Sequence, residues 1–205
     1  MYFIKTPWWL KEIYPNLIWN MNRHEKVLYL TFDDGPHPTA TPFVLEQLQS
    51  YNAKATFFCI GKNVQEHTAL YQQIIAAGHN VGNHTQQHLN GWKTNINKYL
   101  QDIQEAQLHI GSSLFRPPYG RIKKAQAASL IEKKPQFKII MWDILSGDFD
   151  TTISSEKCYS NVIKNAKEGS IIVFHDSTKA WDRMHLALPK VLQYFSAKGF
   201  VFKAL

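Results

Sequence analysis

Short apolar runs alternate along the chain with segments whose apolar residues recur at helical spacing. The runs are rich in β-branched and aromatic residues, which favour strands. They lie at Lys26–Phe32, Ala55–Gly61, His79–Thr85, Ser113–Pro117, Phe137–Ile144, Ser170–Asp176 and Phe200–Leu205. Strand-like runs that alternate with helical segments are typical of repeated βα units, which build a parallel sheet.

The segments between these runs have the ends expected of amphipathic helices. Pro42 suits a first helical position, Gly78 and Gly111 each follow a last apolar residue, and Pro135 cannot continue a helix. We predict helices at Pro42–Tyr51, Val64–Ala77, Ile96–Ile110, Lys123–Lys134, Glu156–Lys167 and Met184–Lys198. The economical α/β fold is a closed or nearly closed parallel barrel with helices outside. An open doubly wound sheet is the alternative, since periodicity does not separate the two.

The length of 205 residues fits one domain, and no linker or low-complexity tract divides it. We predict a single domain over residues 1–205, in which residues 1–25 pack on a barrel formed by residues 26–205. A content of 44% hydrophobic and 19% charged residues is that of a folded globular protein. Cys59 and Cys158 offer no disulfide framework, and we expect two buried free thiols.

The chain is basic, with a formal net charge of +7 and a pI near 9.3. Such a charge suits attraction to anionic polymers. The 23 Lys and Arg residues are scattered, however, and no basic stripe interleaves with aromatic residues, so we expect no nucleic-acid partner.

No run reaches the roughly 18 apolar residues that a membrane span needs. We therefore expect no transmembrane segment.

Two adjacent carboxylates, Asp33 and Asp34, follow the first predicted strand, where Gly35 and Pro36 favour a turn. An ordinary turn would account for the pair when it is taken alone. Adjacent acids repel each other, however, unless a cation or a shared proton relieves them. One acid could therefore bind a metal ion while the other stays free as a base.

His84 and His88 are four residues apart, which would put both imidazoles on one face of a helical turn. Two solvent-facing histidines are the alternative. Two histidines and one carboxylate are a usual ligand set for catalytic zinc, which keeps an open position for water. Asp34 is the natural third ligand.

Arg116 lies in a loop stiffened by two prolines. Its guanidinium could hold Asp33 as a carboxylate, while a backbone N–H of the loop could face a developing oxyanion. A surface arginine beside a turn is the alternative.

His175 ends an apolar strand, where it is either a satisfied core residue or a general acid whose pKa a carboxylate raises. Asp148 is the preferred carboxylate partner and Asp143 the reserve. In parallel α/β folds the carboxyl ends of the strands open onto one face. The candidate residues, although distant in sequence, should therefore meet.

These segments together resemble the five ordered motifs of the polysaccharide deacetylases, carbohydrate esterase family four. The matching segments are TFDDGP, HTQQH, RPPYG, Trp142–Phe149 and VFHD, and the resemblance spans Leu28 to about Leu192. It implies a distorted (β/α) barrel, like a TIM barrel, of about seven to eight parallel strands. It also implies hydrolysis of N-acetyl groups on chitin, chitooligosaccharides, peptidoglycan or xylan.

The resemblance implies a role for each motif residue that this chain retains. It assigns the metal ligands to Asp34, His84 and His88, the general base to Asp33 and the general acid to His175. It matches Arg116 with the residue that orients the base, Tyr119 with the backbone oxyanion donor, and Asp148 with the partner of the acid. The expected cofactor is a divalent metal, zinc first, with cobalt or nickel as alternatives. The expected partner is a polysaccharide or oligosaccharide substrate, and we expect a monomer.

Two positions depart from the commonest family pattern. Phe149 stands where the fourth motif usually has Trp, and Val173 stands where the fifth usually has Leu. Both changes keep an apolar side chain but alter the expected pocket for the acetyl methyl group, so the preferred sugar is left open. Two other functions also stay open: a catalytically silent carbohydrate-binding relative, and an amidohydrolase for a small non-sugar amide.

The aromatic-rich start of the chain predicts a segment that packs across one end of the domain, with contact to a membrane interface as the alternative. Lys11, Glu12 and Pro15 interrupt its apolar run, so it lacks the layout of a secretory signal. We therefore expect a cytoplasmic location by default, whereas the family resemblance points to the cell envelope.

Overall fold

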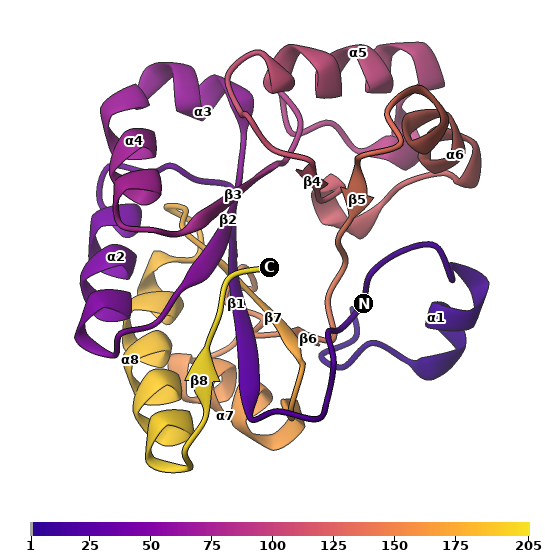
Figure 1. Ribbon diagram of the computed structural model, residues 1–205. Helices are drawn as coiled ribbons and strands as arrows, with labels where there is room; N and C mark the ends of the chain where they lie inside the picture. Colours follow the sequence, from indigo (N-terminus) through magenta and orange to yellow (C-terminus); the bar gives the residue numbers. More distant parts are fainter. Residues whose placement is uncertain (1) are drawn as a thin grey trace.

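A curled parallel sheet flanked by helices organises the fold (Figure 1). The computed structural model describes residues 2–205. The spatial order of the strands is β5-β4-β3-β2-β1-β7-β6, all neighbours are parallel, and β8 pairs with the start of β1. The strands are β1 (Val27–Asp33), β2 (Ala55–Cys59), β3 (Asn80–Asn83), β4 (Leu114–Phe115), β5 (Lys138–Ile139), β6 (Ile144–Leu145), β7 (Ile171–His175) and β8 (Val201–Phe202). This arrangement confirms the predicted distorted barrel of parallel strands.

Helices form most of the connections between the strands. They are α1 (Trp8–Ile13), α2 (Ala40–Ser50), α3 (Gly61–Glu66), α4 (Thr68–Ala76), α5 (Ile96–Gln107), α6 (Lys124–Lys133), α7 (Ser155–Asn165) and α8 (Trp181–Ala197), with 3₁₀ turns at Gly91–Lys93 and Pro118–Gly120. The helix predicted over Val64–Ala77 is two helices, because His67 leaves the helical region with φ −126° and ψ 45°. The other predicted helices agree with the structure to within a few residues at their ends.

The strand predicted over Phe137–Ile144 is also interrupted, and β5 and β6 are its two remaining parts. The segment between them bonds to the start of the chain. Ile18 pairs with Ile140 in a parallel bridge, and Lys5 pairs with Ile144 in an antiparallel one. Within residues 2–205, β5 and β6 are not bonded to each other, so the N-terminal segment lies along the open seam of the barrel.

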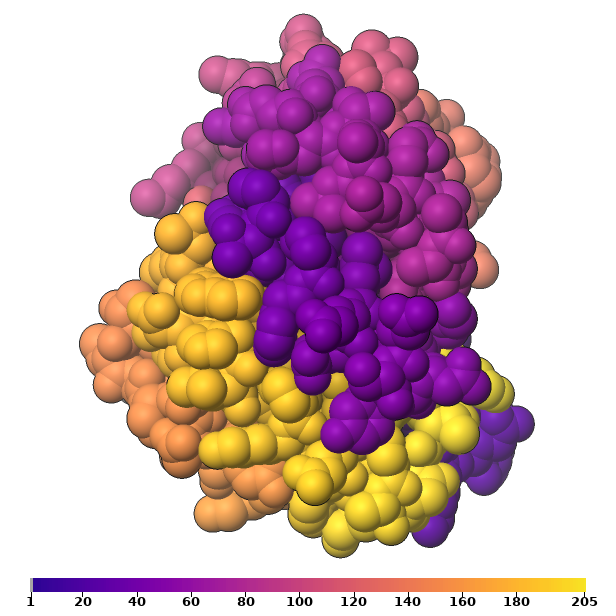
Figure 2. Space-filling view, turned by 90° about the vertical axis from the view of Figure 1, so that its left-hand side faces the viewer, coloured from indigo at the N-terminus to yellow at the C-terminus, as the bar shows by residue number. Residues whose placement is uncertain are grey.

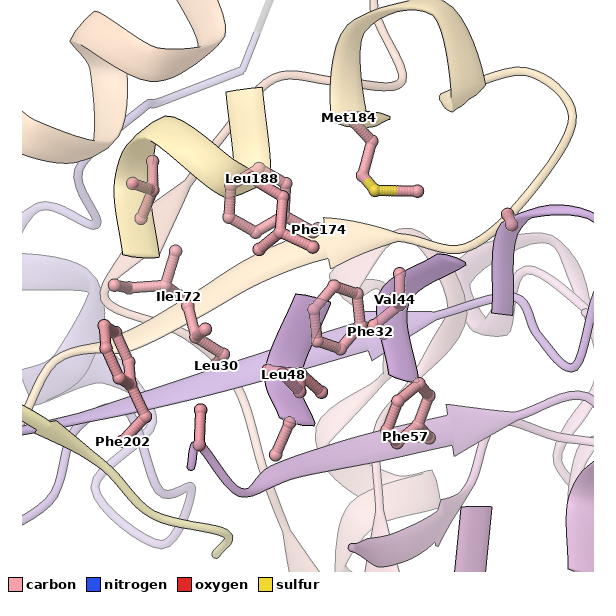
Figure 3. Close-up of a cluster of buried hydrophobic side chains, with 14 of the residues drawn as sticks. Leu30, Phe32, Val44, Leu48, Phe57, Ile172, Phe174, Met184, Leu188 and Phe202 are labelled. Atoms are coloured by element: carbon pink, nitrogen blue, oxygen red, sulfur yellow. The ribbon is translucent and has the colours of Figure 1, made fainter. Parts of the chain in front are cut away.

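The main core lies between the sheet and the helices α2 and α8, whose outer surfaces lie side by side in Figure 2. Figure 3 shows Leu30 and Phe32 of β1 packed with Val44 of α2 and Leu188 of α8. Because successive residues of a strand point to opposite faces, Thr31 and Asp33 turn to the interior of the barrel. The apolar alternation of β1 thus brings a carboxylate into the barrel at its carboxyl end.

A buried acid, Asp143, holds the N-terminal segment against the sheet through ion pairs and a hydrogen bond. Its carboxylate lies 2.9 Å from Lys11 Nζ and 3.0 Å from Arg23 Nη2, and it accepts a hydrogen bond of 2.7 Å from Ser170 Oγ. Burial alone would raise the pKa of Asp143, but these hydrogen bonds hold the pKa below its ordinary value. The carboxylate therefore stays charged and keeps the segment in place.

The aromatic residues at the start of the chain divide into two groups. Trp19 is buried, whereas Trp8 and Trp9 on α1 are exposed. None of the side chains of α1 is fully buried, but Leu10 on α1 and Tyr14 directly after it pack against the hydrophobic cluster that contains Trp19. Met1, the first residue of the predicted segment, lies outside the described residues.

Two further expectations concern the cysteines and the membrane. Cys59 and Cys158 are both buried free thiols, as predicted. None of the helices in residues 2–205 combines the length and the apolar character needed to cross a bilayer.

Leu188 tests the main core, and Leu186 on the same helix provides a matched control. Leu188 is fully buried, whereas 47% of Leu186 is exposed. Leu188→Ala should lower the free energy of unfolding by about 2–5 kcal/mol, because it leaves a cavity. Leu186→Ala should change it by less than about 0.5 kcal/mol. Urea denaturation measures both, and equal losses would contradict the described packing of α8.

Asp143→Asn should lower the free energy of unfolding by about 1.5–3 kcal/mol at neutral pH, the range for hydrogen bonds to a charged group. The pKa of Asp143 is depressed in the folded state, so the advantage of the wild type should be complete above about pH 4 and shrink as the pH falls through the folded pKa. Urea denaturation at several pH values measures it. Glu156→Gln, which removes an exposed partner of Lys190, is the control and should have little effect.

Candidate active site

The carboxyl ends of four parallel strands meet at one rim of the barrel. β1 ends at Asp33 and β7 at His175, while His84 and Arg116 directly follow β3 and β4. Asp33, His84 and His175 line the same cavity of about 510 Å³, and Arg116 lies buried behind it. The structure thus brings together the strand ends that the sequence analysis selected.

Asp34, His84 and His88 form a compact group of possible metal ligands. Asp34 Oδ1 lies 3.7 Å from His84 Nε2 and 3.1 Å from His88 Nε2, and one ligand atom from each residue lies within 4.8 Å of the others. Ligand atoms around one zinc ion at about 2.1 Å are separated by distances of this size. Asp34 Oδ1 is buried and accepts no hydrogen bond from the described residues. The donor set and this unpartnered oxygen both fit a divalent cation.

The two histidines lie on a loop and not on the helical turn that their spacing suggested. Thr85 and His88 have positive φ values of 65° and 55°, which a helix would not allow. Side chains from outside the loop hold this shape. Asn83 Oδ1 accepts the Thr85 N–H at 2.8 Å, and Asp102 of α5 accepts the N–H groups of residues 86 and 87. The loop therefore brings both imidazoles to Asp34 without helical geometry.

Asp34 is fixed by its backbone as well as by its neighbours. It has a φ of 81°, and Asn63 Nδ2 donates to its carbonyl oxygen at 2.7 Å. Burial alone would raise the pKa of this carboxyl group, but His88, His175 and His84 hold the pKa well below its usual range. Asp34 is thus a carboxylate, which is the form that binds a metal.

The hydrogen bond of His84 uses one ring nitrogen and leaves the other free to take part in the group of possible metal ligands. Its Nδ1 lies 2.8 Å from the carbonyl oxygen of Arg116, so Nδ1 carries the proton and Nε2 faces Asp34. Burial lowers the pKa of His84 to about 4. The imidazole is therefore neutral at pH 7, as a metal ligand must be.

Asp33 pairs with Arg116. Arg116 Nη1 donates to Asp33 Oδ1 and to Thr31 Oγ1, both at 2.7 Å. Its Nε and Nη2 donate to the carbonyl oxygens of Ile140 and Met141. The guanidinium thus joins β1 to the segment between β5 and β6 and fixes the carboxylate of Asp33 at the edge of the cavity.

His175 pairs with Asp148, the preferred partner in the sequence analysis. Asp148 accepts hydrogen bonds from His175 Nδ1 at 2.8 Å and from the His175 N–H at 2.7 Å. Burial alone would lower the pKa of His175, but Asp148 outweighs burial and raises it. Asp143, the reserve candidate, bonds instead to Lys11, Arg23 and Ser170.

Tyr119 occupies a tight turn beside the candidate ligands. It has a φ of 60°, its ring centroid lies 4.6 Å from that of His88, and it lines the cavity. The N–H groups of the next two residues donate to the carbonyl oxygens of Pro117 and Pro118.

Phe149 and Val173 also line the cavity. The Phe149 ring packs edge-on against the His175 ring, with 5.2 Å between the ring centroids.

Several residues of the site escaped the sequence analysis. Tyr2 lines the cavity, contacts the Phe149 ring at a centroid distance of 4.9 Å, and donates to Asp150. Asp102 and Asn63 hold the backbone of the site from helices. Asp102 stands out as an acid on the buried face of α5, which is a sequence signal, whereas nothing in the sequence places Tyr2 in the site.

The comparisons with known proteins agree with this arrangement. Residues 20–134 match the polysaccharide deacetylase family. A peptidoglycan-N-acetylglucosamine deacetylase of Bacillus cereus is 34% identical over 200 residues, which cover 94% of this chain and 93% of the relative. A chitooligosaccharide deacetylase of Azorhizobium caulinodans is 30% identical over 203 residues, which cover 90% of this chain and 95% of that protein. The chain therefore belongs to the polysaccharide deacetylase family.

Solved structures share the fold. The crystal structure of the Bc1960 peptidoglycan N-acetylglucosamine deacetylase has a TM-score of 0.88 and 30% identity, and covers 98% of this chain and 95% of that chain. BA3943 of Bacillus anthracis, a family four pseudoenzyme, has a TM-score of 0.79 at 22% identity, and covers 96% of this chain and 69% of that one. Because a pseudoenzyme shares it, the fold alone does not establish catalysis.

The pair of Asp33 and Arg116 predicts a non-additive stability effect. Either Asp33→Asn or Arg116→Gln should cost about 3–5 kcal/mol of unfolding free energy, because each leaves a buried partner uncompensated. The double variant should lose less than the sum. Urea denaturation in the presence of a chelator measures the cycle. The same cycle on the exposed pair of Glu25 and Lys203 is the control and should give almost no coupling. Additive losses for the buried pair would contradict the described contact.

Proposed function

We propose that this protein is a metal-dependent hydrolase that removes N-acetyl groups from a poly- or oligosaccharide containing N-acetylglucosamine. One observation carries the proposal: the adjacent acids face different partners. Asp34 joins His84 and His88, whereas Asp33 pairs with Arg116. The named substrates of the relatives, peptidoglycan N-acetylglucosamine and chitooligosaccharide, support this substrate class.

Asp34, His84 and His88 would hold the metal ion. Zinc suits a set of two imidazoles and one carboxylate, and cobalt or nickel accept the same ligands. When bound, the metal supplies a Lewis acid that polarises the acetyl carbonyl and acidifies water. The hydrogen bond between His84 Nδ1 and the Arg116 carbonyl oxygen orients the ligand nitrogen beforehand.

Asp33 acts as the general base in this proposal. Arg116 holds its carboxylate in place through a hydrogen bond of 2.7 Å, so the carboxylate can take a proton from the water that attacks the acetyl carbon. The Tyr119 N–H would donate to the carbonyl oxygen as negative charge develops on it. Both groups sit on rigid backbone, so little reorganisation is needed during the reaction.

His175 acts as the general acid. Its Nδ1 is engaged by Asp148, which leaves Nε2 as the nitrogen that can meet the departing amine. The raised pKa keeps the imidazole protonated near neutral pH, so a proton is ready when the C–N bond breaks. Phe149 and Val173 would contact the acetyl methyl group, and the smaller valine leaves more room than the usual leucine.

Variants of the two acids separate their proposed roles. Asp33→Asn should reduce acetate release by roughly 10²–10⁴-fold, the usual contribution of a general base, yet keep stoichiometric metal. Asp34→Asn should lose the metal, because it removes a ligand. Metal analysis and acetate release on the same samples measure both. Metal loss in Asp33→Asn would show that the two acids are wrongly assigned.

The substrate class is tested by acetate release from chitooligosaccharides, peptidoglycan fragments and acetylated xylan. We expect release from the first two, which carry N-acetyl groups on glucosamine. A sample without bound metal that releases no acetate from any of them after metal is added would overturn the proposed function. It would favour a silent carbohydrate-binding relative instead.

A further inference from the structure

Exposed apolar side chains gather near the start of the chain. Eleven large apolar or aromatic side chains are exposed in residues 2–205, and five of them lie between residues 2 and 13: Tyr2, Phe3, Trp8, Trp9 and Ile13. Trp8 has 76% of its surface exposed. A contiguous exposed apolar surface on a folded domain usually marks a place where another surface binds.

The orientation of α1 keeps its tryptophans on the outside. Leu10 on α1 and Tyr14 directly after it are four residues apart, and both pack against the cluster that contains Trp19. Trp8 and Trp9 lie elsewhere around the helix, and α1 stands at the edge of the molecule in Figure 1. One side of α1 therefore attaches it to the domain, and its tryptophans face outward.

The exposed surface continues from α1 onto the 3₁₀ turn at Gly91–Lys93. Trp9 and Trp92 line one cavity of about 410 Å³, and 57% of Trp92 is exposed. Phe3 lines the same cavity, and its ring meets the Trp9 ring edge-on at a centroid distance of 6.3 Å. We call Phe3, Trp8, Trp9 and Trp92 together the aromatic face.

Four exposed cations border the aromatic face: Lys5, Arg121, Lys123 and Lys124. The guanidinium of Arg121 lies 5.2 Å from the Trp92 ring centroid, and Lys124 Nζ lies 5.5 Å from the ring centroid of Tyr14. Within residues 2–205, none of the four forms an ion pair with a carboxylate. Glu12 is the one exposed acid on α1. The border of the aromatic face therefore carries an excess of positive charge.

We propose that the aromatic face docks on a bilayer that contains anionic phospholipids, with the tryptophan rings at the level of the headgroups. Tryptophan favours this boundary because its ring is apolar while its N–H still meets polar groups. Lysine and arginine beside the rings are attracted to the negative headgroups. A second copy of this chain, docked face to face, would instead set the same cations against each other. Docking on a bilayer does not depend on the proposed function.

Co-sedimentation of the full chain with vesicles tests the proposal. Vesicles of phosphatidylcholine and phosphatidylglycerol in equal parts should bind the wild type roughly tenfold or more tightly than vesicles of phosphatidylcholine alone, and about 1 M salt should remove this difference. Trp8→Ala should weaken binding to the anionic vesicles about tenfold, whereas Trp8→Phe should keep most of it. The double variant Lys123→Gln and Lys124→Gln should also weaken it about tenfold or more.

The control is Leu186→Ala, because Leu186 is also exposed but lies on α8, on the other side of the sheet from α1 (Figure 1). It should bind the anionic vesicles like the wild type. Trp8 is not among the described residues that line either cavity, so Trp8→Ala should leave urea denaturation and acetate release from a soluble oligosaccharide unchanged.

Three results would overturn the proposal. The first is equal binding of the wild type to both kinds of vesicle. The second is binding that needs Lys123 and Lys124 but not Trp8, which would indicate general attraction to polyanions. The third is a wild type that binds no vesicles but forms dimers that Trp8→Ala abolishes, which would show that a second copy covers the aromatic face. A failure to release acetate would count against the proposed function alone.

Discussion

The buried guanidinium of Arg116 is the contact on which the arrangement of the site depends. Its three nitrogens bond to Asp33 and Thr31 of β1 and to two carbonyl oxygens beyond β5, while its own carbonyl oxygen orients His84. A fully buried arginine is costly unless its donors are satisfied. Through its guanidinium and its carbonyl oxygen, Arg116 contacts both Asp33, the proposed base, and His84, a candidate metal ligand, so the stability of the barrel and the geometry of the site are coupled.

The sheet provides the second constraint. Alternation along β1 turns Leu30 and Phe32 to the helices and Asp33 to the interior, and parallel pairing sets Asp33 beside His175. The groups proposed as base and acid therefore come from neighbouring strands in fixed register. They have separate partners: Arg116 holds the Asp33 carboxylate in place, and Asp148 raises the pKa of His175, as a proposed acid requires.

The N-terminal segment links the stability of the barrel to the surroundings of the site. It lies along the seam that β5 and β6 leave open. Ion pairs of Asp143 with Lys11 and Arg23 hold it there. The same segment carries Tyr2 to Phe149, which packs on His175, and places Trp9 in the wall of a cavity next to the candidate site. The segment that lies along the open seam of the sheet thus also forms part of the wall of the candidate site.

The sequence left the pairings of Asp33 with Arg116 and of His175 with Asp148 open beside other interpretations. By itself it determined the parallel α/β class and the strand ends that carry the candidate residues. These features follow from local periodicity and from the rule that parallel strands end on one face. Only the tertiary structure decided the loop geometry of His84 and His88, the break between β5 and β6, and the place of Tyr2 and Trp9. Each of these depends on hydrogen bonds between segments far apart in the chain, and local propensity does not encode which distant backbone groups will meet.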